Sequence, residues 1–208
     1  MDSAGNVYIA DVYAQVIRQV NATTGVIEAV AGDYAPCSAL PCGDGGPATE
    51  AQLTIPFGVA VDVSGNIYIA DSGDNLIRRV DAITHDISTV ALNSSYSFGG
   101  DGGPATLASM AQPLEVAVDA SDNFFISGGY DFDFGLGGGD EVVRRVDAVT
   151  GIITTVAGQD GNPTEFGFGG DGGPATSALL NNLGIAVDRA GNLYISDAGN
   201  NRVRRVSP

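Results

Sequence analysis

The sequence predicts an all-β protein built from repeated four-stranded sheets, and three observations carry this prediction. The 208 residues include 30 glycines, and aspartate far outnumbers glutamate, a composition that favours turns over helices. One strand-like pattern, represented by Gly65-Asn-Ile-Tyr-Ile-Ala-Asp71, recurs four times, and Gly-Asp-Gly-Gly-Pro-Ala-Thr recurs three times between its copies. Such regular internal repetition is typical of solenoids and propellers.

The strand-like pattern divides the chain into four units with a period of about 58 residues and one insertion. Its asparagine falls at Asn6, Asn66, Asn123 and Asn192. We therefore predict a single repeat region over 1–208, with blades at about 1–54, 55–111, 112–181 and 182–208.

The second unit shows the expected strands most clearly. Four short runs, 58–62, 66–71, 76–81 and 86–91, are rich in β-branched or aromatic residues and are separated by turn formers such as Ser64-Gly65. Four strands with tight turns form an antiparallel meander. Neighbouring copies must cover its faces, so we expect the meanders to pack around an axis as propeller blades.

The glycine-rich segments connect one blade to the next. Their glycines allow a tight turn, and the proline suits the first position of a helix. We therefore expect helices of one or two turns at 47–53, 104–110 and 174–180.

The strand motifs resemble those of NHL repeats, a β-propeller family. The resemblance rests on Gly58-Val-Ala-Val-Asp62, Gly65–Asp71 and Asp74-Asn-Leu-Ile-Arg-Arg-Val80, and it covers essentially the whole chain. The Gly-Asp-Gly-Gly-Pro-Ala-Thr linker variety also resembles units of large extracellular proteins and secreted bacterial proteins. The family includes lyases, nucleic-acid binders and adhesion or interaction modules, so the resemblance implies a fold and leaves several functions open.

The strand count predicts open blade edges. The first unit lacks an innermost strand and the last lacks an outermost one, so the first and last blades are expected to be three-stranded. Closed propellers have about four to eight blades. We expect a partial propeller or one that self-associates, with homo-oligomer contacts through the open edges.

The charge of the chain excludes some partners. Nine basic residues against 25 acidic ones give a net charge of −16, so no basic face is expected for nucleic acid. No apolar run reaches the roughly 18–20 residues of a membrane span, so we predict no membrane insertion. An acidic surface favours neutral or cationic partners.

Most arginines occupy one strand position. They are Arg18, Arg78, Arg79, Arg144, Arg145, Arg204 and Arg205. Adjacent residues on a strand face opposite sides, so each pair divides between the two faces of its blade. Asp11, Asp71 and Asp197 end the neighbouring strand, which predicts ion pairs that stitch the blade together.

The residues give little support for catalysis. The one histidine, His85, replaces the turn glycines Gly25 and Gly151 and is interpreted as a turn residue. It cannot build the multi-histidine zinc site of the lyases that this family resembles. The alternative is a fragment of a propeller lyase or lactonase with a metal in its central channel.

The candidate ligands for such a channel metal are Asp62, Asp119 and Asp188, which suit turn capping equally well. We predict no cofactor. Calcium is left open, because each glycine-rich loop offers one aspartate and calcium takes about six to eight oxygens.

Two further features suggest a binding role outside the cell. Cys37 and Cys42 lie in one short loop that contains prolines, which predicts a disulfide and an extracellular or periplasmic location. Two free thiols are the alternative.

The third unit carries an insertion within 128–140. Tyr130, Phe132 and Phe134 alternate there with Asp131 and Asp133. Aromatics on loops are typical interface anchors, so we predict a partner-binding loop, with a tolerated flexible insertion as the alternative. The favoured function is a non-catalytic binding or structural-interaction module whose partner is a protein or a carbohydrate.

Overall fold

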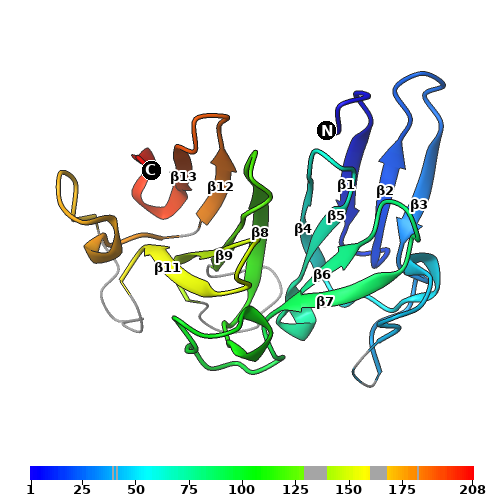
Figure 1. Ribbon diagram of the computed structural model, residues 1–208, viewed down its shortest axis with the longest axis horizontal. Helices are drawn as coiled ribbons and strands as arrows, with labels where there is room; N and C mark the ends of the chain where they lie inside the picture. The colour runs from blue at the N-terminus through cyan, green and yellow to red at the C-terminus, as the bar shows by residue number, and fades with distance from the viewer. Residues whose placement is uncertain (39, 41, 129–139, 160–167, 182) are drawn as a thin grey trace.

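The computed structural model describes residues 1–38, 40, 42–128, 140–159, 168–181 and 183–208, and their strands form four antiparallel sheets (Figure 1). Each sheet is one blade, and the blades have three, four, four and three strands in chain order. The prediction of an all-β propeller with short first and last blades is thus confirmed. Every strand is hydrogen-bonded to the strands that precede and follow it within its blade, as in a meander.

The strands have the following bounds. Blade one contains β1 (Val7–Asp11), β2 (Val16–Val20) and β3 (Ile27–Ala31). Blade two contains β4 (Pro56–Val61), β5 (Ile67–Asp71), β6 (Leu76–Val80) and β7 (Ile87–Ala91). Blade three contains β8 (Pro113–Val118), β9 (Phe124–Gly128), β10 (Val143–Val146) and β11 (Ile153–Ala157). Blade four contains β12 (Leu183–Val187), β13 (Leu193–Asp197) and β14 (Arg202–Val206).

The hydrophobic cores lie between blades rather than inside them. Ile17 of blade one and Ile69 of blade two belong to one core, which also contains Ile87. Tyr68 of blade two and Phe124 of blade three meet in the next core, with ring centroids 5.1 Å apart. A third core joins blades three and four. Each blade therefore depends on its neighbours for burial of its apolar faces.

The linkers contain single 3₁₀ turns instead of the longer helices expected at 47–53, 104–110 and 174–180. The turns are η1 (Ala48–Glu50), η3 (Ala105–Leu107) and η4 (Ala175–Ser177). In the first linker, the Ala48 N–H donates to the His85 carbonyl and the Ala48 carbonyl accepts from the Gly32 N–H, both at 2.9 Å. These bonds hold the segment between two blades, and the chain becomes extended again at Ala51.

The blades present two different ends to solvent. We call one the linker face; it carries the described parts of the linkers 32–55, 92–112 and 158–181 and the turns 12–15, 72–75 and 198–201. The first two of these linkers run along the lower side of Figure 1, and the β8–β9 and β12–β13 turns lie along its upper side. His85 has a φ of +61°, close to the +67° of Gly151, so its interpretation as a turn residue is confirmed. Among the described residues, no helix is long and apolar enough to cross a membrane.

Candidate functional site

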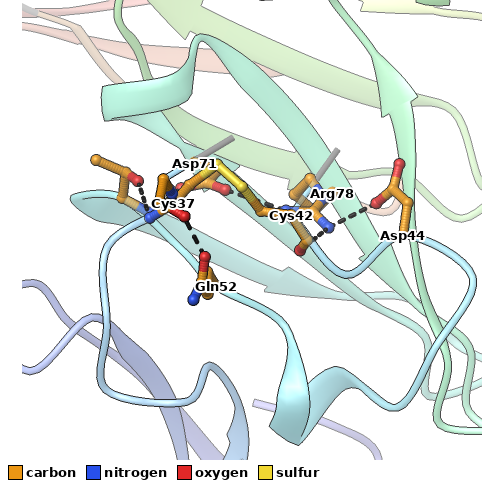
Figure 2. Close-up of a disulfide and its surroundings, with 8 residues drawn as sticks. Cys37, Cys42, Asp44, Gln52, Asp71 and Arg78 are labelled. Carbon is orange, nitrogen blue, oxygen red and sulfur yellow. Dashed lines mark hydrogen bonds and ion pairs between the residues drawn. A yellow bond between two sulfur atoms is a disulfide. The ribbon is translucent and has the colours of Figure 1, made fainter. Parts of the chain in front are cut away.

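The first linker forms a closed loop on the linker face. A disulfide joins Cys37 and Cys42, whose Cα atoms are 5.6 Å apart (Figure 2). At the base of the loop, the Thr54 hydroxyl accepts a hydrogen bond from the Cys37 N–H at 2.9 Å, and the Gln52 side chain accepts one from the Ser38 N–H at 3.4 Å. The N-terminal end of the loop is thereby attached to the segment that leads into β4.

A buried arginine binds the C-terminal end of the loop. Arg78 of β6 is fully buried, and it donates to the Cys42 carbonyl at 3.1 Å and to Asp44 at 2.5 Å (Figure 2). It also pairs with the fully buried Asp71 at 3.3 Å. A planar guanidinium can satisfy several acceptors at fixed angles, so one side chain connects the disulfide loop, the linker and β5.

The Asp71 carboxyl has an unusual protonation equilibrium. Burial raises its pKa to about 7, and the nearby Asp74 carboxylate acts in the same direction. Hydrogen bonds from the Thr54 N–H, at 2.6 Å, and from Arg78 oppose that rise. Burial also raises the pKa of Asp74. The disulfide loop is therefore close to two acidic side chains, Asp71 and Asp74, whose pKa values are raised by burial.

The same arginine position is used in the other blades, which confirms the predicted stitching role. Arg18, Arg78 and Arg204 pair with the aspartate that ends the neighbouring strand, at 3.3 to 3.5 Å. Arg144 has no such partner because Gly128 stands at that position. The second arginine of a pair faces the other side, where Arg79 contacts Asp81 and Arg145 contacts Asp147.

The sequence did not reveal the strongest partner of these arginines. In each glycine-rich linker the aspartate binds the arginine of the following blade, in the pairs Asp44–Arg78, Asp101–Arg144 and Asp171–Arg204. The members of a pair are more than thirty residues apart in sequence. The signal that pointed to them was that a Gly-Asp-Gly-Gly linker precedes each of the three blades that carry an Arg-Arg pair.

The three aspartates suspected as channel ligands have structural partners within their own turns. Asp62 accepts from the Ser64 and Asn66 N–H groups and from the Asn66 side chain, at 2.7 to 2.9 Å. Asp119 and Asp188 repeat this arrangement with Asn123 and Asn192. Turn capping therefore accounts for their recurrence.

One group of metal-ligating side chain types gathers elsewhere in the described part of the chain. Cys37, Cys42 and Asp74 lie with their ligand atoms within 4.8 Å of one another. Because the two sulfur atoms are bonded to each other, the group does not offer thiolate ligands in this state.

Two exposed tyrosines lie on the linkers. Tyr34, which precedes the disulfide loop, is 61% exposed, and Tyr96 of the second linker is 63% exposed. Hydrogen bonds around Tyr96 fix its segment, including one between the Ser97 and Ser109 hydroxyls at 3.2 Å. Sequence reasoning missed both tyrosines. Their signal was an isolated aromatic within a segment of turn-forming residues.

The predicted binding residues Tyr130, Asp131, Phe132, Asp133 and Phe134 lie outside the described residues. The chain enters and leaves that segment at Gly128 and Asp140, on the linker face. There the Asp140 side chain accepts a hydrogen bond from the Ala111 N–H of the second linker at 2.8 Å.

Part of the chain matches a known family model. The model of the teneurin NHL domain matches residues 17–97. Teneurin-1 of Mus musculus is 28% identical over 80% of this chain and 8% of its own length. Teneurin-4 of Mus musculus is 43% identical over 38% of this chain and 3% of its own length. The chain thus spans less than a tenth of these relatives.

Solved structures show the same fold at low sequence identity. A protein of unknown function from Bacteroides thetaiotaomicron has a TM-score of 0.67 and 20% identity, covering 95% of this chain and 43% of that one. Virginiamycin B lyase from Staphylococcus aureus has a TM-score of 0.52 and 16% identity, covering 99% of this chain and 50% of that one. The repeat motifs, the four blades and the partial family match agree with the resemblance of this chain to NHL-repeat β-propeller proteins.

Proposed function

We propose that the chain is a non-catalytic binding module that presents its linker face to a protein partner. The observation that carries this proposal is the pair Tyr34 and Tyr96, two exposed tyrosines on successive linkers. The backbone N–H groups of the residues that follow them, Ala35 and Ser97, are held by hydrogen bonds to Asp33 and Ser95. Tyrosine is enriched among the residues that dominate binding energies. A loop that is already ordered loses little conformational entropy when it binds, so its contacts contribute more fully to affinity.

The net charge of the chain and its disulfide indicate the class of partner and the compartment. The net charge of −16 favours a partner with a neutral or basic contact surface. The Cys37–Cys42 disulfide supports an oxidising compartment, which means an extracellular or periplasmic location. The family match to teneurin NHL domains is consistent with a module inside a larger protein.

The alternative function, a propeller lyase or lactonase with a channel metal, meets a physical obstacle. Its candidate ligands Asp62, Asp119 and Asp188 each accept several hydrogen bonds that close a turn. These bonds already occupy most of the lone-pair sites of each carboxylate, which leaves little capacity for a metal. The likeness to virginiamycin B lyase, at 16% identity, concerns the fold alone.

The proposal is tested by screening the chain against an array of secreted and cell-surface protein domains, with a glycan array in parallel. For a protein that binds, we expect the double variant Tyr34→Ala/Tyr96→Ala to weaken binding by about tenfold or more. The matched control is Ile83→Ala/Val149→Ala, which removes exposed apolar side chains from the β6–β7 and β10–β11 turns and should leave binding unchanged.

Two results would contradict the proposal. One is binding that the control variant weakens and the tyrosine variant does not. The other is metal-dependent turnover in a lyase and lactonase panel that Asp119→Asn abolishes, since this would favour the enzymatic alternative. Glycan binding without protein binding would move the partner to the carbohydrate class and contradict the protein partner proposed above.

A further inference from the structure

The turn between the last two strands has the same construction in the first three blades. It begins at Asn21, Asp81 or Asp147, and one oxygen of that side chain accepts hydrogen bonds from the N–H groups two and three residues later, at 2.9 to 3.2 Å. The turn therefore uses a single side-chain oxygen of its first residue. The second polar atom of that side chain is left for another contact.

The second polar atom has an ion-pair partner in blades two and three but not in blade one. The pairs are Asp81–Arg79 and Asp147–Arg145, at 3.3 and 3.0 Å. Blade one has Gln19 at the arginine position, and its side-chain amide donates to the Tyr8 hydroxyl at 2.6 Å. The Nδ2 atom of Asn21 consequently has no hydrogen-bond partner among the residues that the structure describes.

Blade one differs from its neighbours at a second position of this turn. Thr23 stands where blades two and three have Ile83 and Val149. Together the two differences create Asn21-Ala-Thr23, an asparagine followed two residues later by a threonine. With any residue but proline between them, this spacing is the acceptor motif for N-linked glycans, and the turns of blades two and three lack it.

The threonine position of this turn is open to solvent in blades that have a neighbour on each side. Ile83 is 88% exposed and Val149 is 94% exposed. Ala22 and Thr23 are exposed as well. The exposure is thus a property of the turn itself and does not depend on the position of blade one in the chain.

The second linker contains another motif of this type, Asn93-Ser94-Ser95, whose reacting groups are already bonded. The Asn93 Nδ2 atom donates to the Leu107 carbonyl at 3.0 Å, and the Ser95 hydroxyl is hydrogen-bonded to the Ser97 hydroxyl at 2.8 Å. Both bonds must break before this motif can react. The Asn21 motif has no such obstacle within the described part of the chain.

We propose that Asn21 is an acceptor for an N-linked glycan and that it remains accessible in the folded chain. The donor is a lipid-linked oligosaccharide diphosphate. The Asn21 side-chain nitrogen forms a bond to the anomeric carbon of the first sugar and gives one proton to a base of the transferase. The bond from that carbon to the diphosphate oxygen breaks, and the lipid diphosphate leaves with the electron pair. This inference rests on the location outside the cytoplasm proposed above.

A glycan at Asn21 is compatible with the binding surface proposed above. Asn21 precedes β3 and Tyr34 follows it, so the five residues of that strand separate them by about 17 Å. Figure 1 shows the β2–β3 turn at the upper end of blade one and the first linker at its lower end. We therefore expect the glycan to leave Tyr34 accessible to a partner.

The test uses a purified single-subunit oligosaccharyltransferase that requires only the Asn-x-Ser/Thr motif, a lipid-linked oligosaccharide and the full, folded chain. Peptide mass spectrometry measures the rate of transfer at Asn21 and at Asn93. Synthetic peptides with the sequences of residues 18–26 and 90–98 give the rate of each motif without a fold. We expect Asn21 to keep most of its peptide rate in the folded chain and Asn93 to lose about tenfold or more, because its hydrogen bonds must break first.

Two substitutions remove the motif and preserve the turn, because each introduces the residue that blade three has at that position. Asn21→Asp and Thr23→Val should both abolish transfer at this turn. The matched control is Thr24→Ser, which lies outside the motif, keeps a hydroxyl and should leave the rate unchanged. In the opposite direction, Asp147→Asn/Val149→Thr should give blade three a motif of its own and the chain a second glycan.

Three outcomes would overturn the proposal. They are transfer to the 18–26 peptide without transfer to the folded chain, transfer at Asn21 that Thr23→Val does not reduce, and a folded chain in which Asn93 keeps more of its peptide rate than Asn21. The transferase is supplied directly and no binding partner is present, so the glycan acceptor and the proposed binding function can fail independently.

Discussion

Blades two and four contain the same arrangement, an arginine paired with the linker aspartate and with the aspartate that ends the neighbouring strand, which we call the arginine clamp. The surroundings of the clamp differ between the two blades. In blade two, Arg78 is fully buried and pairs with Asp44 and Asp71 beneath a disulfide loop. In blade four, Arg204 makes the equivalent pairs with Asp171 and Asp197, but it is partly open to solvent and Asp171 is largely exposed. The repeat motif thus determines which groups pair, whereas the covering strand and loop determine how much each pair contributes to the free energy of unfolding.

The largest expected difference between the two blades concerns the arginine itself. Arg78→Ala would leave the buried Asp71 and the Cys42 carbonyl without their partner, so we expect a loss of about 3–5 kcal/mol in the free energy of unfolding. Arg204→Ala also leaves a buried carboxylate, Asp197, without this partner, but Asp171 and part of the Arg204 side chain are already open to water, so the loss should be smaller, about 2 kcal/mol. Chemical denaturation measures both. Equal losses would mean that the environment of the clamp is unimportant.

The buried Asp71 should make the stability of the chain depend on pH in an unusual direction. Its pKa of about 7 lies above the ordinary value of 3.8, so the folded state binds a proton more tightly than the unfolded state. This contribution to stability is complete below about pH 4 and is lost as the pH rises to about 7, with an upper bound of about 4 kcal/mol.

The measurement is the difference in melting temperature between the unaltered chain and Asp71→Asn across this pH range. The advantage of the unaltered chain should shrink as the pH rises. A constant difference would contradict the raised pKa. Asp188, whose pKa is lowered by hydrogen bonds to Asn192, is the control, because its contribution is lost as the pH falls instead.

Removing the disulfide should make the blade-two linker more like that of blade four. Cys37→Ser/Cys42→Ser opens a loop of only a few residues, for which chain entropy predicts a loss of about 2 kcal/mol. Mass measurement before and after reduction establishes the bond, and reducing the unaltered chain should reproduce the loss. If the melting temperature of the unaltered chain does not change on reduction, the loop adds nothing to the clamp.

The smallest difference should come from the linker aspartates. Asp44→Ala removes a bond to Arg78 and one to the Thr89 N–H, so we expect a cost of about 2 kcal/mol. Asp171→Ala removes one exposed pair and should cost less than about 1 kcal/mol. Thermal unfolding compares them. A reversed order would show that the covering strand does not strengthen this contact.

Much of the fold follows from local patterns. The four strands of the second unit lie within about two residues of their predicted positions, because alternation and turn residues act over short distances. The arginine–aspartate pairs along neighbouring strands follow from strand register alone. The predicted linker helices are longer than the turns in the structure. Hydrogen bonds to two blades, which the sequence does not show, outweigh the preference of the proline for a helix start.

The binding surface was harder to predict for the same physical reason. Whether Tyr34 and Tyr96 are exposed depends on how the linkers cross the blade ends, which involves residues far apart in the chain. The partnership of Asp44 with Arg78 likewise spans 34 residues and depends on how the chain between them folds. Composition located neither the exposed tyrosines nor the Asp44–Arg78 pair, although the Gly-Asp-Gly-Gly and Arg-Arg motifs were visible as repeats.

The Asp–Arg clamp has a consequence for how such a chain can grow during evolution. Each aspartate precedes the blade that it secures, so both halves of a clamp lie within a linker and the blade after it. A duplicated gene segment that starts at Gly43 and includes the next blade copies both residues of a clamp. A segment that ends between a linker and its blade copies the aspartate without its arginine. The heritable module is therefore the linker together with the following blade, and not the blade alone.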